Sequence, residues 1–137
     1  AMLADPDECA RFVELTGVPT LAPAIGTAHG IYKGDPNIDF DRIEQIASKV
    51  SVPLVLHGGS GIPDDQVRRC ISLGMAKMNV ATELRIVFSD AIKEVFRENP
   101  EENDPRKYMI PAKKALFDAA VEKIKLCGSV DKAGDFK

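Results

Sequence analysis

The sequence predicts an α/β fold in which a parallel sheet is covered by helices. Two observations favour this fold: segments with helical periodicity alternate with short apolar runs, and those runs lack the polar alternation of half-exposed strands. The expected order is helix, strand, helix, strand, helix, strand, helix, helix. Three strands are few for a barrel or an open doubly wound sheet, so we expect the 137 residues to form part of a larger fold.

Capping residues and periodicity define the expected helices. Asp5 and Asp39 are suited to cap the first two helices, and Thr82 is suited to cap the fourth. The apolar residues of that fourth helix share one face, which is predicted to be core or an oligomer face: Leu84, Val87, Phe88, Ala91, Ile92, Val95 and Phe96. Helices are expected over residues 5–17, 39–50, 63–74 and from 82 onward, and a last one from about residue 104 or 111 to 127.

Strands are expected over residues 19–27, 52–57 and 75–80, the third interrupted by Lys77. They end in the unusual turns "GTAHG", "HGGSG" and "NVAT". Functional sites in parallel α/β folds form at the carboxyl ends of strands. These three turns are therefore the candidate site.

His29 and His57 are the only histidines in the chain, and a glycine follows each of them. They are 28 positions apart, the separation of one strand-loop-helix-strand unit. Neighbouring parallel strands lie ~4.8 Å apart, so both imidazoles can reach one pocket. Two imidazoles suit a divalent transition metal, with a third ligand from elsewhere. The alternative is that each histidine bonds a backbone carbonyl and merely ends its strand, and spacing alone leaves both interpretations open.

The "HGGSG" turn has a composition that suits a phosphate group. Gly58, Gly59 and Gly61 surround Ser60 just before a predicted helix, where backbone N–H groups and the helix dipole favour an anion. The "NVAT" turn leads into the next helix in the same way. A tight turn without a ligand is the alternative for the glycines, and a simple N-cap is the alternative for Thr82.

Three further polar residues lie near these turns. Asn79 ends the third predicted strand, where its amide can also satisfy backbone groups. Lys33 could reach an anionic ligand, although an exposed loop lysine is its simpler interpretation. Tyr32 is expected to be a packing residue rather than a catalytic acid.

Composition argues against several classes of function. A net charge of −3 and scattered basic residues give no reason to expect nucleic-acid binding. No apolar run approaches the ~20 residues of a membrane span, and no signal-peptide pattern is found at the start. Cys9, Cys70 and Cys127 form no CxxC motif and are expected to be reduced, inert thiols of a cytoplasmic protein.

In combination, the stretches "IGTAHGIYKG", "VPLVLHGGSGIP" and "KMNVATELR" resemble the class II, metal-dependent ketose-bisphosphate aldolases. The likeness runs through nearly the whole chain, including "DPRKY" before the last helix. It implies that residues 1–137 form the C-terminal half of a single (β/α)₈ TIM-barrel domain, containing its last three strands, with the N-terminal half absent.

The resemblance implies a lyase of carbohydrate metabolism, such as a glycolytic enzyme. Such enzymes reversibly cleave fructose or tagatose 1,6-bisphosphate into dihydroxyacetone phosphate and glyceraldehyde 3-phosphate. The cofactor implied is zinc, with room for a monovalent cation, and the partner implied is a phosphorylated ketose. "NVATELR" leans toward the tagatose enzymes and "HGIYKGDPNIDFDRI" toward the fructose enzymes, so the preferred sugar stays open.

Site residues follow from the same resemblance. His29 and His57 match two of three zinc ligands, and Asn79 matches the catalytic residue that meets the reacting end of dihydroxyacetone phosphate. The matched substrate and phosphate contacts, with Lys33 and Gly59 expected beside them, are Gly30, Gly58, Ser60, Ala81 and Thr82.

The third zinc histidine, the aspartate beside it and the glutamate loop of that family have no counterpart here, because no "HxDH" stretch occurs. We therefore expect the isolated chain to be inactive, as a truncated or nicked part of an aldolase. A non-catalytic phosphate- or metal-binding module and a half-barrel that assembles with itself or a partner are the alternatives. A homo-oligomer that contacts through the last helix is also expected.

Overall fold

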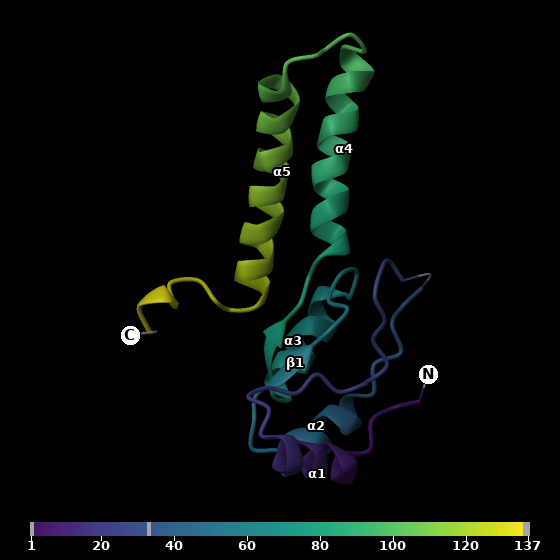
Figure 1. The fold of residues 1–137 in the computed structure, drawn as a ribbon, viewed down its shortest axis with the longest axis vertical. Helices are drawn as coiled ribbons and strands as arrows, with labels where there is room; N and C mark the ends of the chain where they lie inside the picture. The colour runs from purple at the N-terminus through teal and green to yellow at the C-terminus, as the bar shows by residue number, and fades with distance from the viewer. Residues whose placement is uncertain (1, 33, 136–137) are drawn as a thin grey trace. The chain divides into compact units, whose positions relative to one another are not determined.

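The computed structural model describes residues 2–32 and 34–135, and the chain divides into two compact units, residues 1–80 and 81–137 (Figure 1). The first unit holds α1 (Pro6–Thr16), α2 (Phe40–Lys49), β1 (Leu54–Leu56), α3 (Asp64–Ser72) and β2 (Met75–Met78). The second holds α4 (Thr82–Glu98), α5 (Pro105–Leu126) and a short 3₁₀ turn, Ala133–Asp135. Among the described residues, no helix is both long enough and apolar enough to cross a membrane.

The predicted helices of the first unit are confirmed, and so are the expected caps of the first two, α1 and α2. The Asp5 carboxylate accepts from the backbone N–H groups of Asp7 at 2.9 Å and Glu8 at 3.1 Å. Asp39 accepts from the N–H of Arg42 at 2.9 Å in the same way. These bonds satisfy first-turn donors that have no partner within the helix.

β1 and β2 pair in parallel, as the alternation of helices and strands predicts. Leu54 lies opposite Met75 and Leu56 opposite Met78, with one irregularity between Leu54 and Val55. The residues of β1 are all buried. A parallel pair joined through α3 brings the ends of both strands to the same edge, which is where the candidate turns begin.

The prediction of a full strand over residues 19–27 is wrong. The segment makes a single parallel bridge, between Leu21 and Leu54, in which the Leu21 N–H donates to Pro53 O at 3.1 Å and Leu21 O accepts from Val55 N–H at 2.8 Å. In a parallel ladder every second residue donates to the same neighbour, so the next donor would be residue 23. That residue is Pro23, which has no N–H, and the ladder stops there.

The core of the first unit lies between α2, α3 and β1. Its most deeply buried side chains are Ile25, Ile43, Ile46, Leu54, Leu56, Val67 and Cys70. Ile43 and Ile46 form the inward face of α2, and Val67 and Cys70 form that of α3. In α1 the buried residues are Pro6, Cys9 and Val13, and Phe12 is 49% exposed.

In the second unit, α4 and α5 run side by side as an antiparallel pair (Figure 1). Every apolar residue predicted to share one face of α4 is half-buried, and none is fully buried, since two helices cannot enclose a core. Asp104 begins α5, with its carboxylate accepting from Arg106 N–H at 3.0 Å, and Pro111 lies inside the helix. Thr82 was expected to cap α4, but it is the first helical residue, and Ala81 holds the cap position without a side-chain bond.

Candidate functional site

The structure brings His29 and His57 together. Their ring centroids are 5.5 Å apart, and the ring planes meet at 83°. His57 directly follows β1, whereas His29 lies in the turn eight residues beyond the bridge at Leu21. The two imidazoles therefore converge from separate stretches of chain, and their role as metal ligands stays a prediction.

Asn79 lies against His57, where the end of β2 meets the end of β1. Its side-chain Nδ2 is 3.3 Å from His57 Nδ1 and 3.4 Å from His57 Nε2. Its backbone N–H donates to Leu56 O at 2.9 Å, and its backbone carbonyl accepts from Gly59 N–H at 3.0 Å. The backbone thus extends the β1–β2 pairing, which leaves the side-chain amide for the histidine.

Lys77 sets the orientation of that amide. Its ammonium group donates to Asn79 Oδ1. A lysine has donors and no acceptor, so it can hold only the oxygen of the amide, and the NH₂ group then faces His57. Lys77 and Asn79 are two residues apart along an extended chain and therefore share one side of it.

Close packing explains two of the glycines in the "HGGSG" turn. A Cβ at Gly58 would lie 2.3 Å from Ala28 O, and this residue has φ +70°. A Cβ at Gly59 would lie 2.6 Å from Met78 Cγ and 3.0 Å from Asn79 O. The turn is pressed against both the His29 turn and the end of β2, so these glycines are needed whether or not a ligand binds.

Ser60 is 3% exposed and lies in the same turn, four residues before α3 begins. Gly30 has φ +102° and open space where a side chain would be. Ala81 and Thr82 open the second unit and stay predicted phosphate contacts. Lys33, expected to reach an anion, lies outside the described residues.

Tyr32 is a residue whose role the sequence did not indicate. Its hydroxyl accepts from the Ala28 N–H at 2.9 Å and donates to Gly58 O at 3.1 Å. Ala28 precedes His29 and Gly58 follows His57, so one phenol joins the two histidine turns. The sequence shows that Tyr32 lies three residues after His29. Only the bond to Gly58 shows that it also contacts the His57 turn.

The donor chemistry of the site fits part of a zinc site. Neutral imidazole is a common zinc ligand, and catalytic zinc takes three protein ligands. No group of three or more histidine, cysteine, aspartate or glutamate side chains suited to a metal is found within residues 2–32 and 34–135. The two histidines can supply two ligands, and a third has to come from other residues.

The cysteines lie apart from this chemistry. Burial raises the pKa of the Cys70 thiol to about 11, and burial also raises the pKa of Cys9 and of Cys127. All three are unpaired thiols. The protonated form of each is favoured, which agrees with the inert thiols that the sequence predicts.

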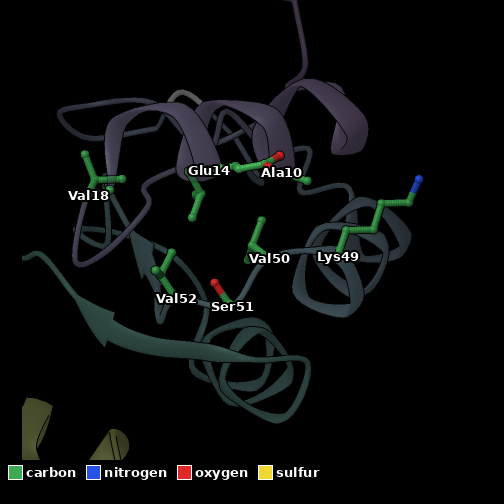
Figure 2. A pocket seen from close by; sticks show the side chains of 9 residues that line it. Ala10, Glu14, Val18, Lys49, Val50, Ser51 and Val52 are labelled. Atoms are coloured by element: carbon green, nitrogen blue, oxygen red, sulfur yellow. The ribbon is translucent and has the colours of Figure 1, made fainter.

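A cleft of about 420 Å³ lies between α1 and the residues that follow α2 (Figure 2). Val18, Val50 and Val52 line it, with Glu14 and Lys49 among its polar residues. The ammonium group of Lys49 pairs with Asp7. None of the predicted site residues lines this cleft, so it does not belong to the histidine site.

Solved structures of aldolases are similar to most of the chain. The YdjI aldolase from Escherichia coli K12 is 44% identical with a TM-score of 0.82, over 96% of this chain and 48% of that one. A protein from Coccidioides immitis, described as a fructose-1,6-biphosphate aldolase, is 30% identical with a TM-score of 0.85, over 99% and 47%. The fructose-bisphosphate aldolase of Campylobacter jejuni, 21% identical with a TM-score of 0.76 over 92% and 45%, supports the fold alone.

The chain thus spans about half the length of each of these three proteins. This agrees with the prediction of an α/β part of a larger barrel. A comparison with protein families matches residues 1–132 to the one described as fructose-bisphosphate aldolase class-II. The chain therefore belongs to the class II fructose-bisphosphate aldolase family, whose members are zinc-dependent lyases.

Proposed function

We propose that this chain is the C-terminal half of an aldolase that reversibly cleaves a ketose 1,6-bisphosphate, fructose or tagatose, into dihydroxyacetone phosphate and glyceraldehyde 3-phosphate. The observation that carries the proposal is the convergence of His29 and His57, at 5.5 Å between ring centroids, with the Asn79 amide against His57. A simple strand-end role would give each histidine its own backbone partner and would not require them to meet.

In this proposal His29 and His57 hold two of the three positions that the protein supplies to zinc. When bound, zinc acts as a Lewis acid that draws electrons toward the ketose carbonyl. The NH₂ group of Asn79, held by Lys77, donates a hydrogen bond where negative charge develops on the substrate. Because the donor is oriented beforehand, little reorganisation is needed during the reaction.

The substrate phosphate is assigned to Gly58, Gly59 and Ser60, with Gly30, Lys33, Ala81 and Thr82 as further contacts. Backbone N–H groups in glycine turns before a helix suit an anion, and the positive φ of Gly58 supports such a turn. Holding the phosphate fixes the distance from it to the reacting carbons, which is a large part of catalysis.

Proton transfer is assigned to residues outside this chain, so the isolated half is expected to bind without turning over. We also expect a homo-oligomer that contacts through α5. The exposure of Ile110 and Phe117, 67% each, supports a contact on that helix.

The test compares three variants of the full-length enzyme that contains this chain. His29→Ala and His57→Ala should lose most of the bound zinc and lower the cleavage rate roughly a thousandfold, because metal stabilisation is worth several kcal/mol. Asn79→Ala should keep zinc and lower kcat about 10²–10³-fold, as when an oriented donor is removed. Zinc is measured by elemental mass spectrometry and cleavage by a coupled assay with each bisphosphate.

Asn103→Ala is the matched control, since Asn103 is exposed in the second unit and should behave as wild type. Full zinc occupancy in His29→Ala and in His57→Ala would contradict the metal assignment. Zinc and phosphate binding with no cleavage in the wild-type, full-length protein would favour the non-catalytic binding module instead.

A further inference from the structure

The hydroxyl of Tyr32 is bonded to the backbone of both histidine turns. It accepts from Ala28 N–H at 2.9 Å and donates to Gly58 O at 3.1 Å, and both lengths lie in the ordinary range. A phenol can act as donor and acceptor at once, which phenylalanine cannot. Ala28 precedes His29 and Gly58 follows His57, so the phenol links the two histidines through one neighbouring residue on each side.

The His29 turn needs this link more than the His57 turn does. His57 follows β1 directly, and bonds from Asn79 N–H to Leu56 O and from Gly59 N–H to Asn79 O continue the pairing past it. The segment that leads to His29 leaves the sheet at Pro23. Two backbone hydrogen bonds hold this segment, and both lie before Gly26: Ala24 O accepts from Ala4 N–H, and Ile25 O accepts from Asp39 N–H.

The two turns also touch through their backbones. The space beside Gly58 is filled by Ala28 O, which an added Cβ would approach to 2.3 Å. Contact alone prevents the turns from moving closer, but it does not prevent them from moving apart. The Tyr32 hydroxyl supplies the attraction that holds them in contact.

We propose that Tyr32 is a positioning residue that sets the distance between His29 and His57 and thereby the affinity of the site for its metal. This inference rests on the proposed function, in which both histidines bind zinc. The Tyr32 hydroxyl bonds to the backbone of Ala28 and Gly58, so Tyr32 acts on the imidazoles through the residues next to them. Its contribution is to order the two ligands before the metal arrives, in the manner of residues that support metal ligands from behind.

The test is Tyr32→Phe in the full-length enzyme, with Tyr108→Phe as the matched control. Tyr108 is the other tyrosine of the chain and packs against Phe96 in the second unit, at 5.2 Å between ring centroids. Zinc affinity is measured by competition with a chelator, and kcat is measured again with zinc in excess. We expect Tyr32→Phe to weaken zinc binding about 10–100-fold, the usual effect of removing a group that orients a metal ligand.

With excess zinc, kcat of Tyr32→Phe should return to within about twofold of wild type, because the hydroxyl does not touch the reacting atoms. The unfolding temperature of the metal-free protein is measured in parallel. An unchanged zinc affinity, with or without a lower unfolding temperature, overturns the inference. A loss of kcat that excess zinc does not restore overturns it as well.

His57→Ala separates this inference from the proposed function. If His57→Ala binds zinc as wild type does, the proposed function fails and the inference fails with it. If His57→Ala loses zinc while Tyr32→Phe keeps it, the inference about Tyr32 fails alone.

Discussion

At the scale of single residues, the geometry of the candidate site depends on residues whose chemistry permits only one arrangement. Lys77 can only donate, so it fixes which end of the Asn79 amide faces His57. Gly58 can occupy φ +70° without a side chain, so it lets the His57 turn press against Ala28. Both restrictions act next to His57.

Gly58→Ala is expected to destabilise the protein by roughly 3 kcal/mol, because the new methyl group meets a backbone oxygen in addition to the strain of a positive φ. Gly17→Ala is the control: Gly17 has φ +64° with nothing within 4 Å of an added Cβ. It should cost only about 1–2 kcal/mol, the conformational part. Denaturant unfolding of both variants gives the comparison, and equal losses would show that the contact with Ala28 is unimportant.

The same scale shows where prediction from sequence ended. The convergence of His29 and His57 could be predicted, since each follows a predicted strand and parallel strands end at one edge. The bond from Tyr32 to Gly58 could not, because the two residues are 26 positions apart and nothing local indicates that they meet. Tyr32 was therefore expected only to pack.

At the scale of elements, the starts of the helices could be predicted from residues close together in the sequence. Asp5, Asp39 and Asp104 each cap a helix through a side-chain bond to a first-turn N–H. Such signals need only three or four residues, so they can be read from sequence. The strand expected over residues 19–27 was wrong, because its apolar composition matched a buried strand while Pro23 removed the donor that the ladder required.

The carboxylate cap of α1 is expected to make the stability of the protein depend on pH. Backbone N–H groups of Glu8 and Asp7 lower the pKa of Asp5 below its ordinary value of 3.8. A lowered pKa in the folded state means that the ionised cap stabilises the protein above 3.8, and that this contribution is lost as the pH falls through the folded pKa. Asp5→Ala should therefore be less stable than wild type at pH 7.

The difference between Asp5→Ala and wild type should shrink on acidification. Asp5→Asn is the control, since its amide oxygen caps without titrating and its stability difference should not follow this pH dependence. Thermal unfolding between pH 7 and pH 2 measures all three proteins. A gap between Asp5→Ala and wild type that is constant over this range would contradict the assigned role of the carboxylate.

At the scale of the whole molecule, the match to the E. coli relative includes 96% of this chain but only 48% of that protein. The described residues bring two histidines together. A match to about half of a relative is expected of part of a barrel, whose site is assembled from the ends of several strands.

We expect the isolated chain to show no measurable cleavage of either bisphosphate and the chain combined with the remaining half to recover it. Denaturing intact-mass spectrometry establishes which polypeptides are present, and the coupled assay measures turnover in each sample. The control is the combined sample that carries His57→Ala, which should stay inactive. Full turnover by the 14.9 kDa chain alone would contradict the need for a second half.

Pro23 has a consequence for the motions of the molecule. With the ladder ended at Leu21, the stretch from Gly26 to the His29 turn can open without breaking any strand pairing, whereas opening of the His57 turn breaks the backbone bonds of Asn79 that continue the β1–β2 pairing. Local opening therefore costs less free energy on the His29 side than on the His57 side. The two imidazoles stand on parts of the backbone with unequal opening energies, and amide hydrogen exchange would be faster around the first of them than around the second.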